Sequence, residues 1–182
     1  MRVITGSARG RKLITLEGED VRPTTDIVKE ALFSIIQFEI EGRRVLDLFG
    51  GSGQLAIEAL SRGADSAVIV DMSRKSIEII NQNLEHTGFS KKAVVVCADA
   101  LSFLSRRTEK YDIAFLDPPY SVGILEKALE KTAPVMNEGG VIICEAPFKD
   151  ELPEIAGDFR LQKKYRYGKT GLFLYRRDTQ ED

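Results

Sequence analysis

One stretch limits the possible folds of this chain more than any other, the residues Arg44–Gly53, which read RVLDLFGGSG. An apolar run ends there on a carboxylate and breaks into three glycines just before a helical pattern begins at Gln54. The run predicts a strand buried on both faces, and the glycines allow a ligand to approach the backbone closely. The first amides of the following helix are free to bind such a ligand. The stretch is typical of a nucleotide-binding turn, although these residues alone leave a plain tight turn open.

From Arg43 onward, apolar strand patterns and helical patterns alternate with short turns between them. This alternation predicts an α/β fold with a doubly wound, mostly parallel sheet. We expect helices over 54–60, 77–84, 101–104 and 122–133, and strands over 45–48, 66–70, 93–97, 111–116 and 141–144. A final antiparallel hairpin is expected from the pattern of 159–167 and 171–176.

The N-terminal part has a different pattern, and we expect it to form a small extension, residues 1–40, of a main domain, residues 41–182. Residues 1–16 alternate in the manner of a β-hairpin with a flexible basic tip. A helix is expected from Thr25 or Asp26, either of which can cap it, to Phe38. The apolar stripe of this helix would pack on the main domain.

The composition indicates one compact domain, since 182 residues with 43% hydrophobic content suffice for a sizeable core. No apolar run approaches the roughly 20 residues that span a bilayer, so we expect a cytoplasmic protein without membrane contact. Cys97 and Cys144 lie near the ends of apolar strand patterns and are expected to be buried, reduced thiols. Because His86 is the single histidine and no CxxC spacing occurs, we expect no metal site.

The net charge of −2 hides two basic ends. Residues 1–16 and residues 160–177 contain several arginines and lysines and no acid. If both ends meet in the fold, they form a positive surface suited to a polyanion, whereas solvated edge strands are the plain alternative. The candidate polyanion contacts are Arg9, Arg11, Lys12, Arg22, Thr24 and Lys169.

Four aspartates each follow one of the predicted parallel strands, namely Asp47, Asp71, Asp99 and Asp117. Any one of them could simply cap a helix, but ligands of open α/β sheets bind at the carboxyl ends of the strands. A nucleoside accounts for two of them. Asp71 is placed to accept from both ribose hydroxyls, and Asp99 could accept from an adenine amine while Ala100 offers its amide. At this point an NAD-dependent dehydrogenase is still possible, although the turn reads GGSG and not GxGxxG.

The segment Asp117-Pro118-Pro119-Tyr120 favours one chemistry among these. Two prolines fix the backbone and provide no amide donor, so the Pro118 carbonyl can act with the Asp117 carboxylate as a pair of acceptors. Such a pair binds both hydrogens of a planar amine and localises its lone pair, while Tyr120 offers a ring on which a base can stack. These residues predict alkylation of an exocyclic amine, whereas the plain reading is a Pro-Pro pair that ends a strand.

These motifs, in this order, resemble the class I S-adenosylmethionine-dependent methyltransferases that act on amino groups, whose fold is Rossmann-like. The stretches MRVITGSARGRKL, RPTTDIVKEALFSII, GGSGQLAIEALSRGA and YRYGKTGLFLYRR are similar to the RsmD family, the bacterial 16S ribosomal RNA guanine-N2 methyltransferases. The resemblance covers nearly the whole chain. It departs from the family at Gly50, where alanine is more frequent, and at Asp71, where glutamate is common.

The resemblance implies S-adenosylmethionine as cofactor and 16S ribosomal RNA, within an assembling small subunit, as partner. The family target is guanine 966, which must lie in a loop or be flipped out of its stack to reach the site. We expect a monomer. The implied cofactor-binding residues are Asp47, Phe49, Gly50, Gly51, Gly53, Asp71, Met72, Asp99, Ala100 and Asp117. The implied catalytic residues, which hold the guanine, are Asp117, Pro118, Pro119 and Tyr120.

Three other functions are left open by the sequence. The same transfer could act on an adenine of DNA or on a glutamine side chain, although the related motif there is usually NPPY. A module could bind the cofactor and RNA without turnover. An NAD oxidoreductase would share the acid after the second strand.

Overall fold

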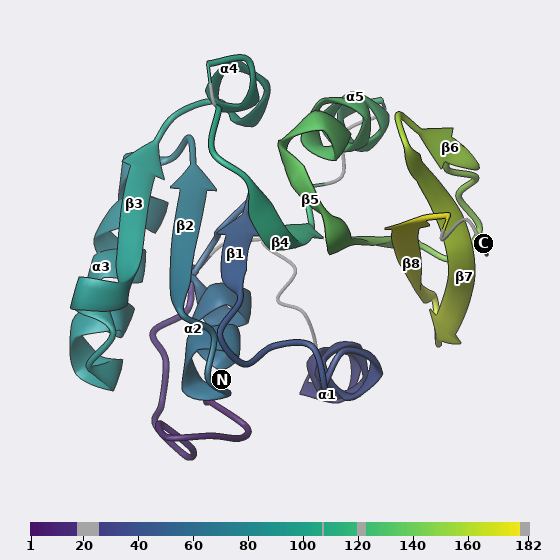
Figure 1. Ribbon diagram of the computed structural model, residues 1–182. Coiled ribbons are helices and arrows are strands. Elements are labelled where there is room, and N and C mark those ends of the chain that lie inside the picture. The colour runs from purple at the N-terminus through teal and green to yellow at the C-terminus, as the bar shows by residue number, and fades with distance from the viewer. Residues whose placement is uncertain (18–25, 107, 120–122, 179–182) are drawn as a thin grey trace.

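The computed structural model of the protein describes residues 1–17, 26–106, 108–119 and 123–178. Within these ranges, eight strands form a single sheet in the order β3-β2-β1-β4-β5-β8-β7-β6, with helices on both of its faces (Figure 1). The strands are β1 Arg44–Asp47, β2 Ser66–Asp71, β3 Ala93–Cys97, β4 Tyr111–Leu116, β5 Met136–Pro147, β6 Ile155–Ala156, β7 Phe159–Tyr167 and β8 Thr170–Arg177. The helices are α1 Asp26–Ile35, α2 Gln54–Ser61, α3 Arg74–Thr87, α4 Ala100–Leu104 and α5 Ile124–Thr132, with short 3-10 turns η1 Ser90–Lys92 and η2 Ala133–Val135.

The first five strands run parallel, with β1 between β2 and β4, and their carboxyl ends lie at one edge. The last three strands continue the sheet in antiparallel pairing. The predicted Rossmann-like α/β fold is therefore confirmed. The structure corrects some boundaries: α1 ends at Ile35 and not at Phe38, β5 begins at Met136, and the short β6 was not predicted.

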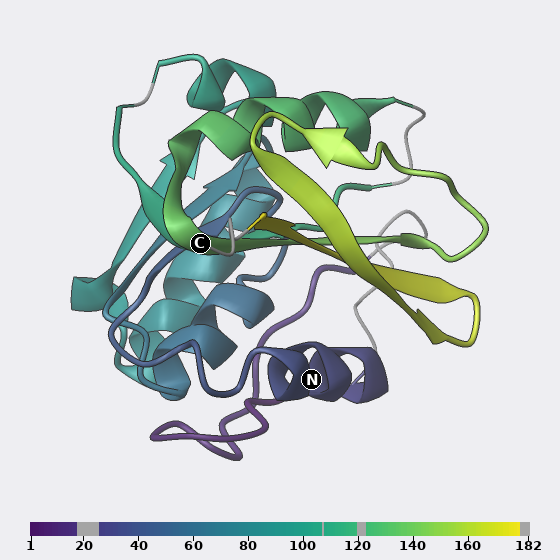
Figure 2. The ribbon, with the colours of Figure 1, turned by 45° about the vertical axis from the view of Figure 1, so that its right-hand side comes forward.

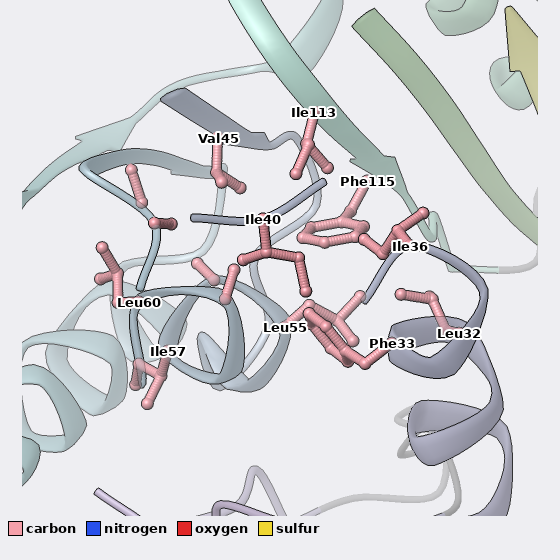
Figure 3. Packing of buried hydrophobic residues seen from close by; sticks show 14 of the residues in the cluster. Leu32, Phe33, Ile36, Ile40, Val45, Leu55, Ile57, Leu60, Ile113 and Phe115 are labelled. Carbon is pink, nitrogen blue, oxygen red and sulfur yellow. The ribbon is translucent and has the colours of Figure 1, made fainter. Parts of the chain in front are cut away.

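Two hydrophobic clusters cover the two faces of the sheet. The first joins α1, α2 and α3 to the sheet, and Figure 3 shows its central residues. There the rings of Phe33 and Phe115 meet edge to face, with their centroids 5.6 Å apart, which fixes α1 against β4. The second cluster lies under α4 and α5 and reaches Phe173 and Tyr175 of β8. Figure 2 shows α1 and α5 on opposite sides of the strands.

The N-terminal segment reverses direction as predicted but forms one antiparallel bridge, Arg2 to Lys12, and not two continuous strands. Beyond that bridge it packs against helices, because Val3 and Leu13 belong to the same cluster as α1 and α2. Besides bonds within the segment, its backbone bonds to side chains of α2 and α3. The division into an extension and a main domain stays a prediction, since both share this core.

The two cysteines differ, which corrects one expectation. Cys144 is buried in the central strand β5, whereas Cys97 is exposed. The reason is that β3 is an edge strand of the sheet, so its apolar sequence does not imply burial on both faces. Within the described ranges, no helix has the length and apolar character that crossing a bilayer requires.

Candidate active site

The glycine turn after β1 is held against β2 by its own backbone. Gly50 donates its amide to the carbonyl of Val70 over 2.8 Å, and Gly51 donates to Oδ2 of Asp71 over 2.9 Å. Gly51 and Gly53 have φ values of 59° and 79°, which favour glycine, and α2 begins directly afterwards. The sequence thus forms the predicted strand, turn and helix, and Asp71 fastens the turn in place.

Position 50 requires glycine because of close packing and not because of backbone conformation, since its φ is not positive. A Cβ atom at this position would lie 2.5 Å from Cγ2 of Ile69 and 3.1 Å from Cδ1 of Ile80. The turn therefore packs directly on the side chains of β2 and α3. The alanine that is more frequent in the resembling family has no room here unless Ile69 shifts.

A cavity of about 770 Å³ opens at the carboxyl ends of the parallel strands. It brings together most of the predicted site residues from both halves of the sheet. The predicted residues that line it are Asp47, Phe49, Gly50, Gly51, Asp71, Met72, Asp99, Ala100, Asp117, Pro118 and Pro119. Gly53 is not in the lining and shapes the turn instead, and Tyr120 lies outside the described residues. The nucleotide turn and the Asp-Pro-Pro segment thus share one cavity.

Asp47 is the buried acid of this cavity, with only 1% of its surface exposed. Neither of its carboxylate oxygens has a hydrogen-bond partner among the described residues. Burial raises the pKa of Asp47 from 3.8 to about 7, and the charge of Asp117 adds to this increase. The nearby Ala56 amide opposes the increase although its geometry falls short of a hydrogen bond, and the charge of Asp71 adds to the increase. A buried acid of this kind is destabilising until an opposite charge or a donor reaches it.

Asp71 and Asp99 are partly occupied by the backbone. Besides its bond from Gly51, Asp71 accepts from the amide of Ser73 over 2.8 Å. Asp99 is the N-cap of α4 and accepts from the amide of Ser102 over 2.9 Å. An ionised carboxylate has about four acceptor positions, so both side chains keep capacity for a ligand. Helix capping and ligand binding are therefore compatible at these positions.

The sequence did not reveal several other residues that line the cavity. One group belongs to the N-terminal segment, and another follows β5 and precedes the β8 strand. The unpredicted lining residues that are polar or terminal are Met1, Thr15, Ser52, Gln54, Ser73, Ser76, Glu126, Glu145, Asp150, Glu151 and Thr170. Their sequence surroundings show no motif, because the separate helices, strands and loops that carry them meet only in the folded chain.

Two buried polar side chains hold the N-terminal segment beside this cavity. Glu58 of α2 is fully buried and accepts from the amides of Ile4 and Thr5, both over 2.9 Å. It also pairs with Lys29 of α1 over 3.3 Å. Burial lowers the pKa of Lys29, and the Glu58 carboxylate opposes this decrease. The polar Glu58 within the otherwise apolar run QLAIEALS is the signal that could have indicated such a role.

Asn83 of α3 is the second of these side chains. It accepts from the amide of Ile14 over 2.8 Å and donates to the carbonyls of Ile14 and Ser52, both over 2.9 Å. Because Ser52 belongs to the glycine turn, one carboxamide joins the N-terminal segment to that turn. Met1 and Thr15, near the two ends of this segment (residues 1–16), both line the cavity.

The predicted polyanion contacts do not form one continuous surface. Arg9, Arg11 and Lys12 are exposed on the N-terminal segment, where Arg11 donates to the carbonyl of His86 on α3. Lys169 is exposed in the turn between β7 and β8, at the other end of the sheet (Figures 1 and 2). The condition for one shared positive surface, that both basic ends meet, is therefore not fulfilled by these residues, and their contact with RNA stays a prediction. Arg22 and Thr24 lie outside the described residues.

Comparison with known proteins places the chain in one family. The family model described as "Conserved hypothetical protein 95" matches residues 1–176. A Bacillus subtilis protein named "Putative rRNA methyltransferase YlbH" is 41% identical over 97% of this chain and 99% of its own. The "Ribosomal RNA small subunit methyltransferase D" of Escherichia coli is 36% identical over 99% of this chain and 91% of its own.

Solved structures agree with this match. The structure described as "Putative methyltransferase yhhF from Escherichia coli" superposes with a TM-score of 0.87. The two chains are 34% identical, and the alignment covers 99% of each chain.

Proposed function

Because this chain belongs to the RsmD family of methyltransferases, we propose that it methylates the exocyclic N2 amine of a guanine in small-subunit ribosomal RNA. S-adenosylmethionine is the proposed methyl donor, and guanine 966 of the 16S RNA is the proposed target. The relatives' printed names support ribosomal RNA as the substrate. The site itself supports the choice of cofactor and of an amine as acceptor.

The charge of the cavity is the observation that carries the proposal. Eight acidic side chains line it, and no lysine or arginine does so among the described residues: the acids are Asp47, Asp71, Asp99, Asp117, Glu126, Glu145, Asp150 and Glu151. Such a lining favours a cationic cofactor without phosphate over NAD, whose pyrophosphate it would repel. S-adenosylmethionine is such a compound. Its ammonium group would place a positive charge beside the Asp47 carboxyl, which has no hydrogen-bond partner among the described residues. The residues present therefore fit this cofactor.

Each remaining residue has a role in this proposal. Asp47 and the glycine turn would hold the methionine end, Asp71 the ribose, and Asp99 with Ala100 the adenine. S-adenosylmethionine, when bound, supplies a methyl group on a positively charged sulfur. Asp117 and the Pro118 carbonyl would accept the two hydrogens of the guanine amine and orient its lone pair. Asp117 would then take the proton that leaves the amine. Stacking of the base on Tyr120 stays a prediction.

The Asp117→Asn variant tests this assignment. It removes the charge and proton acceptor while keeping the shape, so methyl transfer to small subunits should fall at least about a hundredfold. Affinity for S-adenosylhomocysteine, measured by calorimetry, should change less than about threefold. Asp112→Asn is the matched control, because Asp112 lies at the opposite end of the same strand and bonds to the Arg44 amide and Asn137. Full transfer by Asp117→Asn would contradict the assignment.

A further inference from the structure

The basic residues of β7 and β8 fall into two groups, with acidic or with aromatic partners. Lys163, whose Nζ lies 5.0 Å from the ring centroid of Tyr165, belongs to the second group. Three arginines are neutralised by acids. Arg160 pairs with Asp178 over 2.9 Å, and Arg176 pairs with Glu39 through two bonds of 2.5 and 2.6 Å. Arg177 lies 3.7 Å from both Glu138 and Asp158. These arginines tie the end of the sheet to neighbouring segments and carry little net charge outward.

The second group has aromatic partners and, within the described ranges, no acidic one. Nζ of Lys164 lies 4.3 Å from the ring centroid of Phe148, and the Arg166 guanidinium carbon lies 5.0 Å from the same centroid. Lys164 also donates to the carbonyl of Asp150, and Arg166 to that of Gly168. A ring holds both cations in place without neutralising them. Together with Lys169, these residues form what we call the rim patch: Phe148, Lys164, Arg166 and Lys169.

The rim patch adjoins the cavity. Pro147, Asp150 and Thr170 all line the cavity, and they neighbour Phe148 and Lys169 along the chain. The amide of Phe148 donates to the carbonyl of Lys169 over 2.8 Å, which joins the loop after β5 to the β7–β8 turn. The patch is thus fixed to one wall of the cavity by backbone and side-chain bonds.

Because the cavity is acidic, the RNA phosphates must be bound by cations outside it, such as those of the rim patch. A guanine can enter such a cavity, but the phosphates on either side of it cannot be neutralised by eight carboxylic acids. The sugar-phosphate backbone must therefore be held outside, by cations that are not already paired with acids. Lys164, Arg166 and Lys169 meet this requirement beside the cavity wall to which Pro147, Asp150 and Thr170 belong.

We propose that the rim patch binds the RNA phosphates next to the target guanine while the base occupies the cavity. This inference rests on the proposed function and names a substrate-binding surface for it. Arg166 would contribute a bidentate contact to a phosphate, and Lys164 and Lys169 would contribute single charges. Phe148 would position the first two cations without touching the RNA.

The test compares cations of one strand that differ in their partners. Arg166→Gln and Lys164→Gln each remove a charge, and glutamine at 164 can still donate to the Asp150 carbonyl. We expect the double variant to bind fluorescein-labelled single-stranded RNA of the small-subunit target sequence at least about tenfold more weakly than wild type does. Its plot of log affinity against log salt concentration should be shallower by about 1.4, since each lost contact to a single strand removes about 0.7. Arg160→Gln, on the same strand but paired with Asp178, should bind within about twofold of wild type.

Calorimetry with S-adenosylhomocysteine checks that the cavity is intact in each variant, and Arg166→Gln alone decides the question if the double variant loses this binding. Equal losses from Arg160→Gln and Arg166→Gln, or wild-type RNA binding by Arg166→Gln, would overturn the inference. The two proposals fail differently. If wild-type protein methylates small subunits but Arg166→Gln binds RNA normally, the rim patch alone is wrong. If wild-type protein transfers no methyl to RNA while Arg166→Gln still weakens RNA binding, the proposed function is wrong and the rim patch still binds RNA.

Discussion

Asp47 is buried, and its carboxyl has no hydrogen-bond partner among the residues that the structure describes, so the stability of the ligand-free protein should depend on pH. The folded protein keeps this proton up to about pH 7, whereas the unfolded chain loses it near its ordinary pKa of 3.8. The folded state therefore binds more protons over this range, and its stability should fall as pH rises toward 7 and then stay constant. Asp47→Asn removes this dependence.

We predict that the stability gained by Asp47→Asn increases by roughly 2–3 kcal/mol from about pH 5 to about pH 8, since one pKa unit corresponds to about 1.4 kcal/mol. Urea unfolding of wild type and variant at both values measures it. Parallel pH profiles for the two proteins would show that Asp47 does not keep its proton. The same variant should bind S-adenosylhomocysteine more weakly, because it lacks the charge that faces the ammonium.

Gly50 leads to a second prediction for a single residue. An added methyl would meet Cγ2 of Ile69 at 2.5 Å, so Gly50→Ala should lower the free energy of unfolding by roughly 1–3 kcal/mol. Ile69→Leu removes that Cγ2 methyl, and the double variant should recover part of the loss. Thermal unfolding of the four proteins measures this coupling. A neutral Gly50→Ala would mean that the turn moves away from β2 at little cost.

Among the structural elements, the N-terminal segment depends on helices that lie far from it in sequence. Asn83→Ala removes three hydrogen bonds to Ile14 and Ser52 and leaves their backbone groups without these partners. We expect faster amide hydrogen exchange over residues 1–16, a stability loss of roughly 2–3 kcal/mol, and weaker S-adenosylhomocysteine binding. Asn81→Ala, an exposed asparagine two residues earlier on α3, is the matched control. Unchanged exchange in residues 1–16 would show that other contacts hold the segment.

Elements with strong local patterns were predictable from the sequence. The turn after Asp47 and the alternating runs on either side fixed the parallel half of the sheet, because each strand and helix there follows its own periodicity. Four of the acids that line the cavity were also predictable, because they stand directly at or after strand ends: Asp47, Asp71, Asp99 and Asp117. The position of β3 at the sheet edge was not predictable from the sequence AVVVC, and so the exposure of Cys97 was missed. Glu58 and Asn83 were missed because their partners in the N-terminal segment lie more than fifty residues away.

At the scale of the whole molecule, charge is divided between the cavity and the surfaces around it. Acids line the cavity, while cations without an acidic partner in the described part of the chain lie on the N-terminal segment and, at the other end of the sheet, in the rim patch. The sequence indicated basic ends but not which arginines are neutralised, because ion pairs such as that of Arg176 with Glu39 form between distant segments. The sequence therefore predicted the kind of partner better than the surface that would bind it.

The central claim is that this cavity methylates a guanine amine of ribosomal RNA. The most direct measurement is nucleoside analysis of RNA from small subunits that lack the modification, after incubation with the protein and labelled S-adenosylmethionine. We predict that the label appears in N2-methylguanosine at a single position of the 16S RNA. Label in methylated adenine or in protein, or no label while S-adenosylhomocysteine still binds, would contradict the claim.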